Sequence, residues 1–120
     1  MRRELLDLHR SLVDSERREY ERARGRMTDR AFLGALISDP ELAWLNPLTS
    51  LIVQLDELLE EQTPQSAARL DDCIAEIRKL LKPDAAGQGF HRKYDDAMQR
   101  SPEVVVAHGK VMRALQASKN

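Results

Sequence analysis

Two histidines and two glutamates are the side chains of this chain whose placement could support metal binding. His9 lies at the edge of an apolar stripe near the start of the sequence, and His108 lies on an apolar stripe near its end. If the first and last helices pack together, Glu4 or Glu103 could join the two imidazoles around a divalent metal. In a simpler interpretation, each histidine borders the core and makes one hydrogen bond. We therefore predict no metal and no cofactor, and we keep these four residues as candidates for a metal site.

Other arrangements that carry catalytic chemistry are missing from the sequence. It contains no serine or cysteine in the sequence context of a catalytic nucleophile, no glycine-rich phosphate loop and no zinc-finger spacing. A catalytic carboxyl group needs a raised pKa in a cleft, whereas the acidic run from Asp56 to Glu61 is expected to be exposed. These observations favour a non-catalytic protein over an enzyme, and we assign no catalytic residue.

The stretch from Leu42 to Leu59 is expected to form the central helix. Two overlapping apolar stripes run along it in steps of three and four residues. They consist of Leu45, Leu48, Ile52, Leu55 and Leu59, and of Trp44, Leu48, Leu51, Leu55 and Leu58. Together they are wider than one helix seam, which predicts a helix buried on two sides. We expect the face around Trp44, Leu48, Leu51 and Leu55 to exceed what one chain of 120 residues can cover, so that a protein partner covers part of it.

Proline and glycine punctuation divides the chain into helices. Four of the five prolines follow a residue that can cap a helix start. These capping residues are Asp39, Asn46, Thr63 and Ser101. The longer expected helices span about residues 3–24, 47–61, 64–81 and 102–117, a shorter one spans residues 90–99, and a loop covers residues 84–89. We predict an all-α single domain over residues 1–120, an up-and-down antiparallel helical bundle of four longer helices with additional short helices.

Apolar surface is sparse in the second half of the first helix. The first half is amphipathic through Leu5, Leu8 and Leu12, with Leu6 and Val13 beside them. Residues 14–26 keep only Tyr20 and Ala23, on the line of Leu6 and Val13. This half is therefore either solvated or covered by a partner through Tyr20 and the helix end up to Met27. A short helix capped by Thr28 follows, with its apolar residues on one face. These residues are Phe32, Leu33, Leu36 and Ile37.

Charge is distributed unevenly, although the net charge is only −1. Residues 31–68 contain six acidic residues and no lysine or arginine, whereas the segments on both sides lean basic. Arg18, Arg22 and Arg26 form a basic ribbon, but acidic residues interrupt it. We therefore predict no nucleic-acid partner, and we keep Arg18 and Arg22 as candidates for a protein contact.

The single cysteine, Cys73, indicates a reducing compartment, because it has no partner for an internal disulfide. The first ten residues hold no apolar run typical of a signal peptide, and no stretch is long enough to span a membrane. We predict a cytoplasmic protein with no membrane contact.

Three segments of the sequence resemble a group of small bacterial all-helical proteins of unknown function. They are LLDLHRSLVDSERREYE, FLGALISDPELAWLNPLTSLIVQLDELLE and SPEVVVAHGKVMRAL. The resemblance implies no activity and no site residue. The sequence thus predicts a non-catalytic interaction or structural module, acting as a homodimer or through another protein. The alternative is a small-ligand or metal-binding bundle with a site near His9 and His108.

Overall fold

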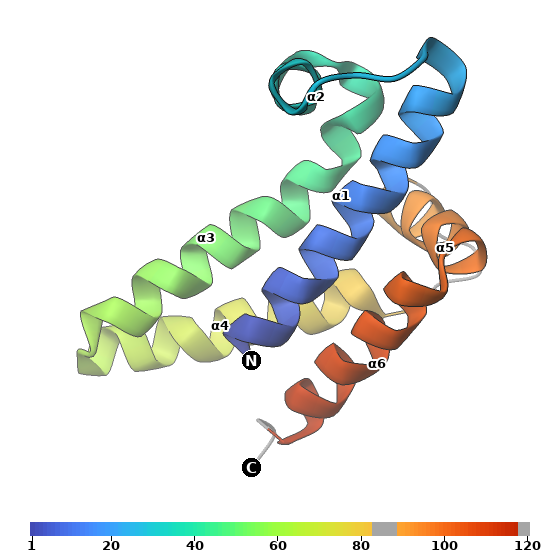
Figure 1. Ribbon diagram of the computed structural model, residues 1–120. Helices are drawn as coiled ribbons and strands as arrows, with labels where there is room; N and C mark the ends of the chain where they lie inside the picture. Colours follow the sequence, from blue (N-terminus) through green and yellow to red (C-terminus); the bar gives the residue numbers. More distant parts are fainter. Residues whose placement is uncertain (83–88, 118–120) are drawn as a thin grey trace.

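The computed structural model describes residues 1–82 and 89–117, and every regular element in these ranges is helical (Figure 1). The elements are α1 (Arg2–Arg24), α2 (Asp29–Ser38), the 3-10 helix η1 (Pro40–Leu45), α3 (Asn46–Glu61), α4 (Pro64–Leu81), α5 (Phe90–Arg100) and α6 (Pro102–Ala117). The prediction of an all-α protein is confirmed. In the same ranges, no helix combines the length and the apolar character needed to cross a membrane. The loop predicted over residues 84–89 lies, apart from Gly89, outside the described residues.

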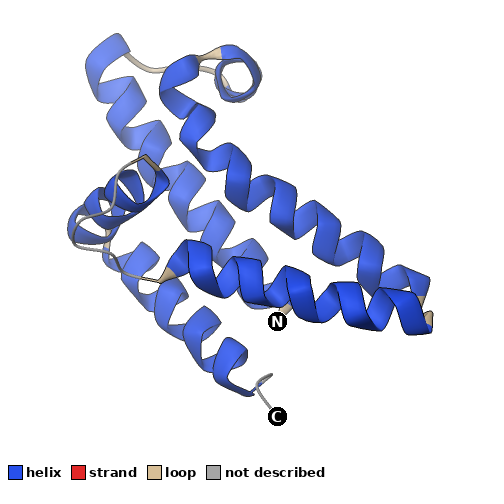
Figure 2. Cartoon of the chain, turned by 180° about the vertical axis from the view of Figure 1, so that it is seen from behind, coloured by secondary structure: helices blue, strands red, loops and turns tan. Residues whose placement is uncertain are grey.

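The long helices pack around α1. α6 lies along one side of α1 and α3 along the other, while α4 folds back on α3 as a helical hairpin (Figure 1). Seen from behind, α4 runs at an angle to the direction shared by α1, α3 and α6 (Figure 2). A regular up-and-down arrangement of four helices therefore stays a prediction.

The core is built from the apolar stripes of the long helices, to which α5 also contributes. Leu5, Leu8 and Leu12 of α1 follow one another at steps of three and four residues and are fully buried. The buried residues of α3 are Leu48, Ile52, Leu55 and Leu58, and those of α6 are Val104, Ala107, Val111 and Leu115. The predicted periodicity thus identifies the inner faces of α1, α3 and α6, with the exception of Leu59, which was placed on the stripe of α3 and is 41% exposed.

The face of α3 that was expected to need a partner is covered by the chain itself. Leu48 and Leu55 are at most 1% exposed, and Leu51 is half-buried against the core. Trp44, on η1, is also half-buried and packs on Phe90 at a ring-centre distance of 5.4 Å. Because α1 and α4 lie against α3, the partner surface expected around Trp44, Leu48, Leu51 and Leu55 is corrected to interior packing.

A smaller apolar cluster joins the end of α1 to α2 and η1. It consists of Tyr20, Phe32 and Leu42, each at most 9% exposed. The Tyr20 hydroxyl donates a hydrogen bond to Asp39, and the Arg24 guanidinium lies 4.0 Å from the centre of the Tyr20 ring. Tyr20 is thus covered within the chain, which corrects the expectation that a partner covers it.

Side-chain caps are present at the helix starts for which a capping residue was predicted, with one exception. Thr28 accepts a hydrogen bond from the backbone N–H of the third residue after it, Thr63 forms a capping box with Ser66, and Ser101 caps α6. The prediction that Asn46 caps a helix is wrong. Asn46 is already the first residue of α3, because η1 continues directly into that helix and no side chain caps its start.

Candidate functional site

His9 lies in the groove between α1 and α3. Its Nε2 is 2.9 Å from the Oγ1 of Thr49, which in turn donates to the carbonyl oxygen of Leu45 at 3.2 Å. Since the single hydroxyl hydrogen is used on that carbonyl, the imidazole is the donor to Thr49. The groove has a volume of about 250 Å³, and Leu36 and Ile37 of α2 border it. Burial lowers the pKa of His9 below its ordinary value of 6.5, so the side chain is neutral at pH 7.

His108 faces α5. Its Nδ1 lies 2.6 Å from the hydroxyl oxygen of Tyr94, in a hydrogen bond. Tyr94 stacks on Phe90, and Phe90 contacts Trp44, so an aromatic row runs from η1 to α6. Burial lowers the pKa of His108 and raises the pKa of Tyr94. The neutral imidazole of His108 is the hydrogen-bond partner of the Tyr94 hydroxyl, and Tyr94 is only 3% exposed.

The four candidates for a metal site do not come together. His9 contacts α3, whereas His108 contacts α5. Glu4 forms an ion pair with the N-terminal amine at 2.9 Å, and Glu103 forms one with Arg18 at 3.5 Å. Across residues 1–82 and 89–117, no three His, Cys, Asp or Glu side chains are grouped so that they could hold a metal ion. The geometry favours the interpretation of both histidines as residues that border the core.

A groove of about 430 Å³ does lie between the first and last helices, where the sequence places a small-ligand pocket. Glu4 and Glu103 line it, together with Val106 and Ala107 of α6. Neither histidine is among its lining residues. Small-ligand binding between α1 and α6 stays a prediction.

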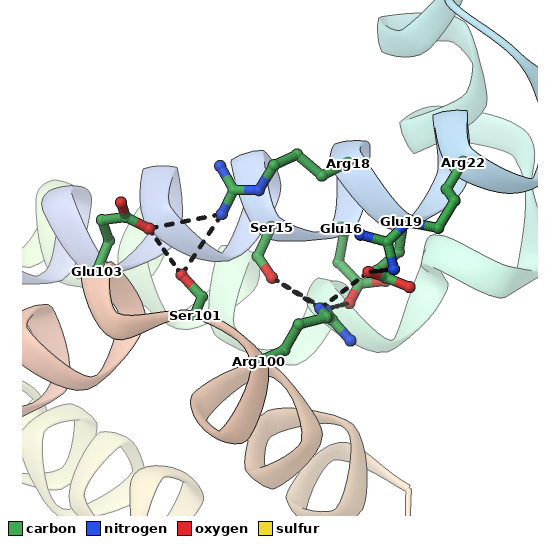
Figure 3. Close-up of polar contacts among 8 residues, drawn as sticks. All are labelled: Ser15, Glu16, Arg18, Glu19, Arg22, Arg100, Ser101 and Glu103. Carbon is green, nitrogen blue, oxygen red and sulfur yellow. Dashed lines mark hydrogen bonds and ion pairs between the residues drawn. The ribbon is translucent and has the colours of Figure 1, made fainter.

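A polar junction joins α1 to the corner between α5 and α6 (Figure 3). Arg100, the last residue of α5, donates to the Oγ of Ser15 from Nε at 3.2 Å and from Nη2 at 2.9 Å. Its Nη2 also lies 2.9 Å from a carboxylate oxygen of Glu16, and Glu19 is 3.7 Å from its Nε. Ser15 is fully buried, so its hydroxyl needs a partner inside the protein. Arg100 is that partner.

The two arginines expected to contact a partner already form ion pairs within the chain. Arg18 lies 3.5 Å from both the Ser101 hydroxyl and the Glu103 carboxylate, and Arg22 lies 3.1 Å from Glu19 (Figure 3). The side chains of both arginines remain more than half exposed. These pairs reduce the positive charge that the ribbon could offer to phosphates.

Four large apolar side chains remain exposed near the groove that holds His9. Ile37 is 81% exposed, Leu33 is 57%, Val53 is 52% and Leu6 is 42%. We call Leu6, Leu33, Ile37 and Val53 the outer face. They come from α1, α2 and α3, three elements that adjoin the groove.

The register of α1 and α3 places the outer-face residues of these helices side by side. The ion pair between Arg2 and Asp56 and the hydrogen bond between His9 and Thr49 join the same edges of the two antiparallel helices. Leu6 of α1 and Val53 of α3 each lie between these two contacts, about one helical turn from either of them. On α2, Leu33 and Ile37 lie on one stripe at i, i+4 spacing.

Comparison with protein-family models, curated proteins and solved structures finds no match to this chain. The resemblance to small bacterial helical proteins stays a prediction. The functional assignment therefore rests on the geometry of the chain itself.

Two features of the site were missed from the sequence. The first is the contact between Ser15 and Arg100. A signal for it exists, because the stripe Leu5, Leu8 and Leu12 continues to Ser15 and so puts a hydroxyl in the core. The second is the outer face, because the sequence pattern puts Leu33 and Ile37 on the same apolar face as Phe32 and Leu36 and does not separate exposed from covered residues.

We expect the free energy of unfolding to fall as the pH drops below 6.5. Burial lowers the pKa of His9 and of His108 in the folded chain, whereas both return to the ordinary value of 6.5 on unfolding. The unfolded chain therefore takes up protons first. The stability contributed by these histidines is complete above pH 6.5 and is lost as the pH falls through their pKa values in the folded chain. Urea unfolding at a series of pH values measures this dependence.

A variant with His9→Gln and His108→Gln is the control for this prediction. Carboxyl groups titrate near pH 4, roughly two pH units lower, and so affect a different range. The double variant should show a smaller fall in stability between pH 6.5 and about 5 than the parent chain. An equal fall in both proteins would show that other groups cause it.

Proposed function

We propose that this protein is a non-catalytic helical module that works through protein contacts made by its outer face. In this proposal, residues 1–120 form one domain, an up-and-down bundle with additional short helices, that acts in the bacterial cytoplasm. The class of function is the one predicted from the sequence. The contact surface, however, is the side of the molecule that bears α2 and not the inner face of α3.

The observation that carries the proposal is the exposure of Ile37. This residue and Leu33 share a stripe of α2, a helix whose only buried residue is Phe32. Burying a side chain of this size contributes about 1.5–3 kcal/mol. A partner that covers Leu33 and Ile37 would therefore gain this free energy on binding. Leu6 and Val53 extend the apolar surface across α1 and α3, and contiguous exposed apolar surface marks contact sites.

Photocrosslinking from position 37 tests the proposal. We expect benzoylphenylalanine in place of Ile37 to give protein adducts in cells that produce the full chain, because a partner covers this side chain. The same residue in place of Glu76, which is exposed on α4, should give none. Circular dichroism of both variants establishes that they remain helical. A lack of adducts at position 37, or equal adducts at the two positions, would contradict the proposal.

A further inference from the structure

Opposite charges lie at the two ends of the surface that contains the outer face. Arg30 is in the first turn of α2, in one stripe with Leu33 and Ile37. Glu60 is in the last turn of α3, seven residues after Val53 on the same stripe. A helix favours anions at its N-terminus and cations at its C-terminus, so each of these charges lies at the unfavourable end of its helix.

Neither charge is compensated by the described residues. Arg30 and Glu60 are both exposed, and the side chain of neither makes an ion pair or hydrogen bond with residues 1–82 or 89–117. The last turn of α3 contains no basic residue, and Arg69 of α4 reaches only Glu61, at 3.6 Å. A positive charge brought to Glu60 and a negative charge brought to Arg30 would each offset an unfavourable helix-end charge.

We propose that a second copy of this chain binds to the outer face, with the two α3 helices antiparallel, so that Arg30 of each copy pairs with Glu60 of the other. This inference rests on the proposed function and names its partner. The interface is isologous, because the same surface serves on both copies. The outer-face residues of α2 in one copy lie on those of α1 and α3 in the other.

The charge arrangement selects this orientation. α3 has 16 residues and is about 24 Å long, with η1 and α2 near its start and Glu60 near its end. A half-turn about an axis that crosses the surface midway between Arg30 and Glu60 exchanges the two ends, so that each positive end meets a negative end. Four apolar side chains per copy is little for an interface that buries about 800 Å² on each partner. We therefore expect a reversible dimer that dissociates on dilution.

A charge-swap experiment tests the pairing. Sedimentation equilibrium over a concentration series should show that the unsubstituted chain dimerises. Arg30→Glu and Glu60→Arg should each weaken dimerisation by about tenfold or more, because each dimer then contains two like-charge contacts. An equimolar mixture of the two variants should dimerise again, because the mixed dimer contains only opposite-charge contacts.

Two substitutions provide matched controls. Arg92→Glu on α5 and Glu76→Arg on α4 change an exposed charge by the same amount outside the proposed interface, and they should leave dimerisation unchanged. We expect Arg30→Glu and Glu60→Arg to leave the fold intact, so that weaker dimerisation of these variants would reflect the interface. Arg30→Glu puts a negative charge at a helix N-terminus and Glu60→Arg puts a positive charge at a C-terminus, and the helix dipole favours both changes.

The outcomes separate this inference from the proposed function. A chain that stays monomeric at every concentration overturns the second copy as partner, whereas crosslinks from position 37 to a different protein would still support the proposed function. A dimer that neither interface variant weakens, or that the mixture fails to restore, overturns the antiparallel pairing. Weakening by each variant with recovery in the mixture supports it.

Discussion

Leu48→Ala should lower the free energy of unfolding by about 2–5 kcal/mol, the range found for leucine-to-alanine changes in protein cores. Leu48 is fully buried in the cluster to which α1, α3, α4 and α6 contribute. Its truncation removes buried methyl groups and leaves a cavity that neighbouring side chains fill only in part. Urea unfolding followed by circular dichroism measures the change.

Val53→Ala is the matched control for this core substitution. Val53 lies on the same helix but is 52% exposed, and alanine has the higher helix propensity. We expect its effect at low protein concentration to stay within about 0.5 kcal/mol. Similar losses for both variants would contradict the assignment of one side of α3 to the core and the other to the outer face.

Arg100→Ala should destabilise the chain by about 1–3 kcal/mol, because it leaves the buried hydroxyl of Ser15 without its partner. Ser15 is 0% exposed and receives both hydrogen bonds from Arg100. The substitution also removes the ion pair with Glu16, whose side chain is only 13% exposed. The free energy of unfolding of the variant provides the measurement.

Arg22→Ala tests whether the effect at Arg100 comes from the junction or from loss of any arginine near Glu19. The side chain of Arg22 is 75% exposed and contacts only that glutamate among the described residues, so its loss should cost no more than about 0.5 kcal/mol. In a double-mutant cycle, Ser15→Ala should reduce the cost of Arg100→Ala, because the hydroxyl that needs the guanidinium is then absent. Additive costs would contradict a specific contact between Ser15 and Arg100.

The helices could be predicted because local chemistry determines them. Capping residues directly before proline mark the starts of α4 and α6, and both helices begin as predicted, at Pro64 and Pro102. Except at Leu59, which is 41% exposed, the stripes of α1 and α3 identify the inner faces, since burial on one side of a helix requires steps of three and four residues. The cap expected at Asn46 fails because a 3-10 turn before it, η1, already provides the helix start.

The exposure of α2 could not be predicted from its own sequence. Its four large apolar residues suit a buried helix, yet only Phe32 is fully packed, against Tyr20 and Leu42. Which of these residues is covered depends on how the end of α1 meets η1, and this contact is absent from the local pattern. The same limit applies to Arg100, which lies 85 residues from the serine that it contacts.

The most direct test of the central claim is to locate the residues that a crosslinker at position 37 reaches. Chains labelled with ¹⁴N and ¹⁵N are mixed before irradiation, so that peptides joined between two copies differ in mass from those joined within one. We expect mixed-isotope crosslinks from position 37 to the part of the partner around Leu6 and Val53. Crosslinks confined to single chains, or mixed crosslinks that fall on α4 or α6, would contradict docking of a second copy on the outer face.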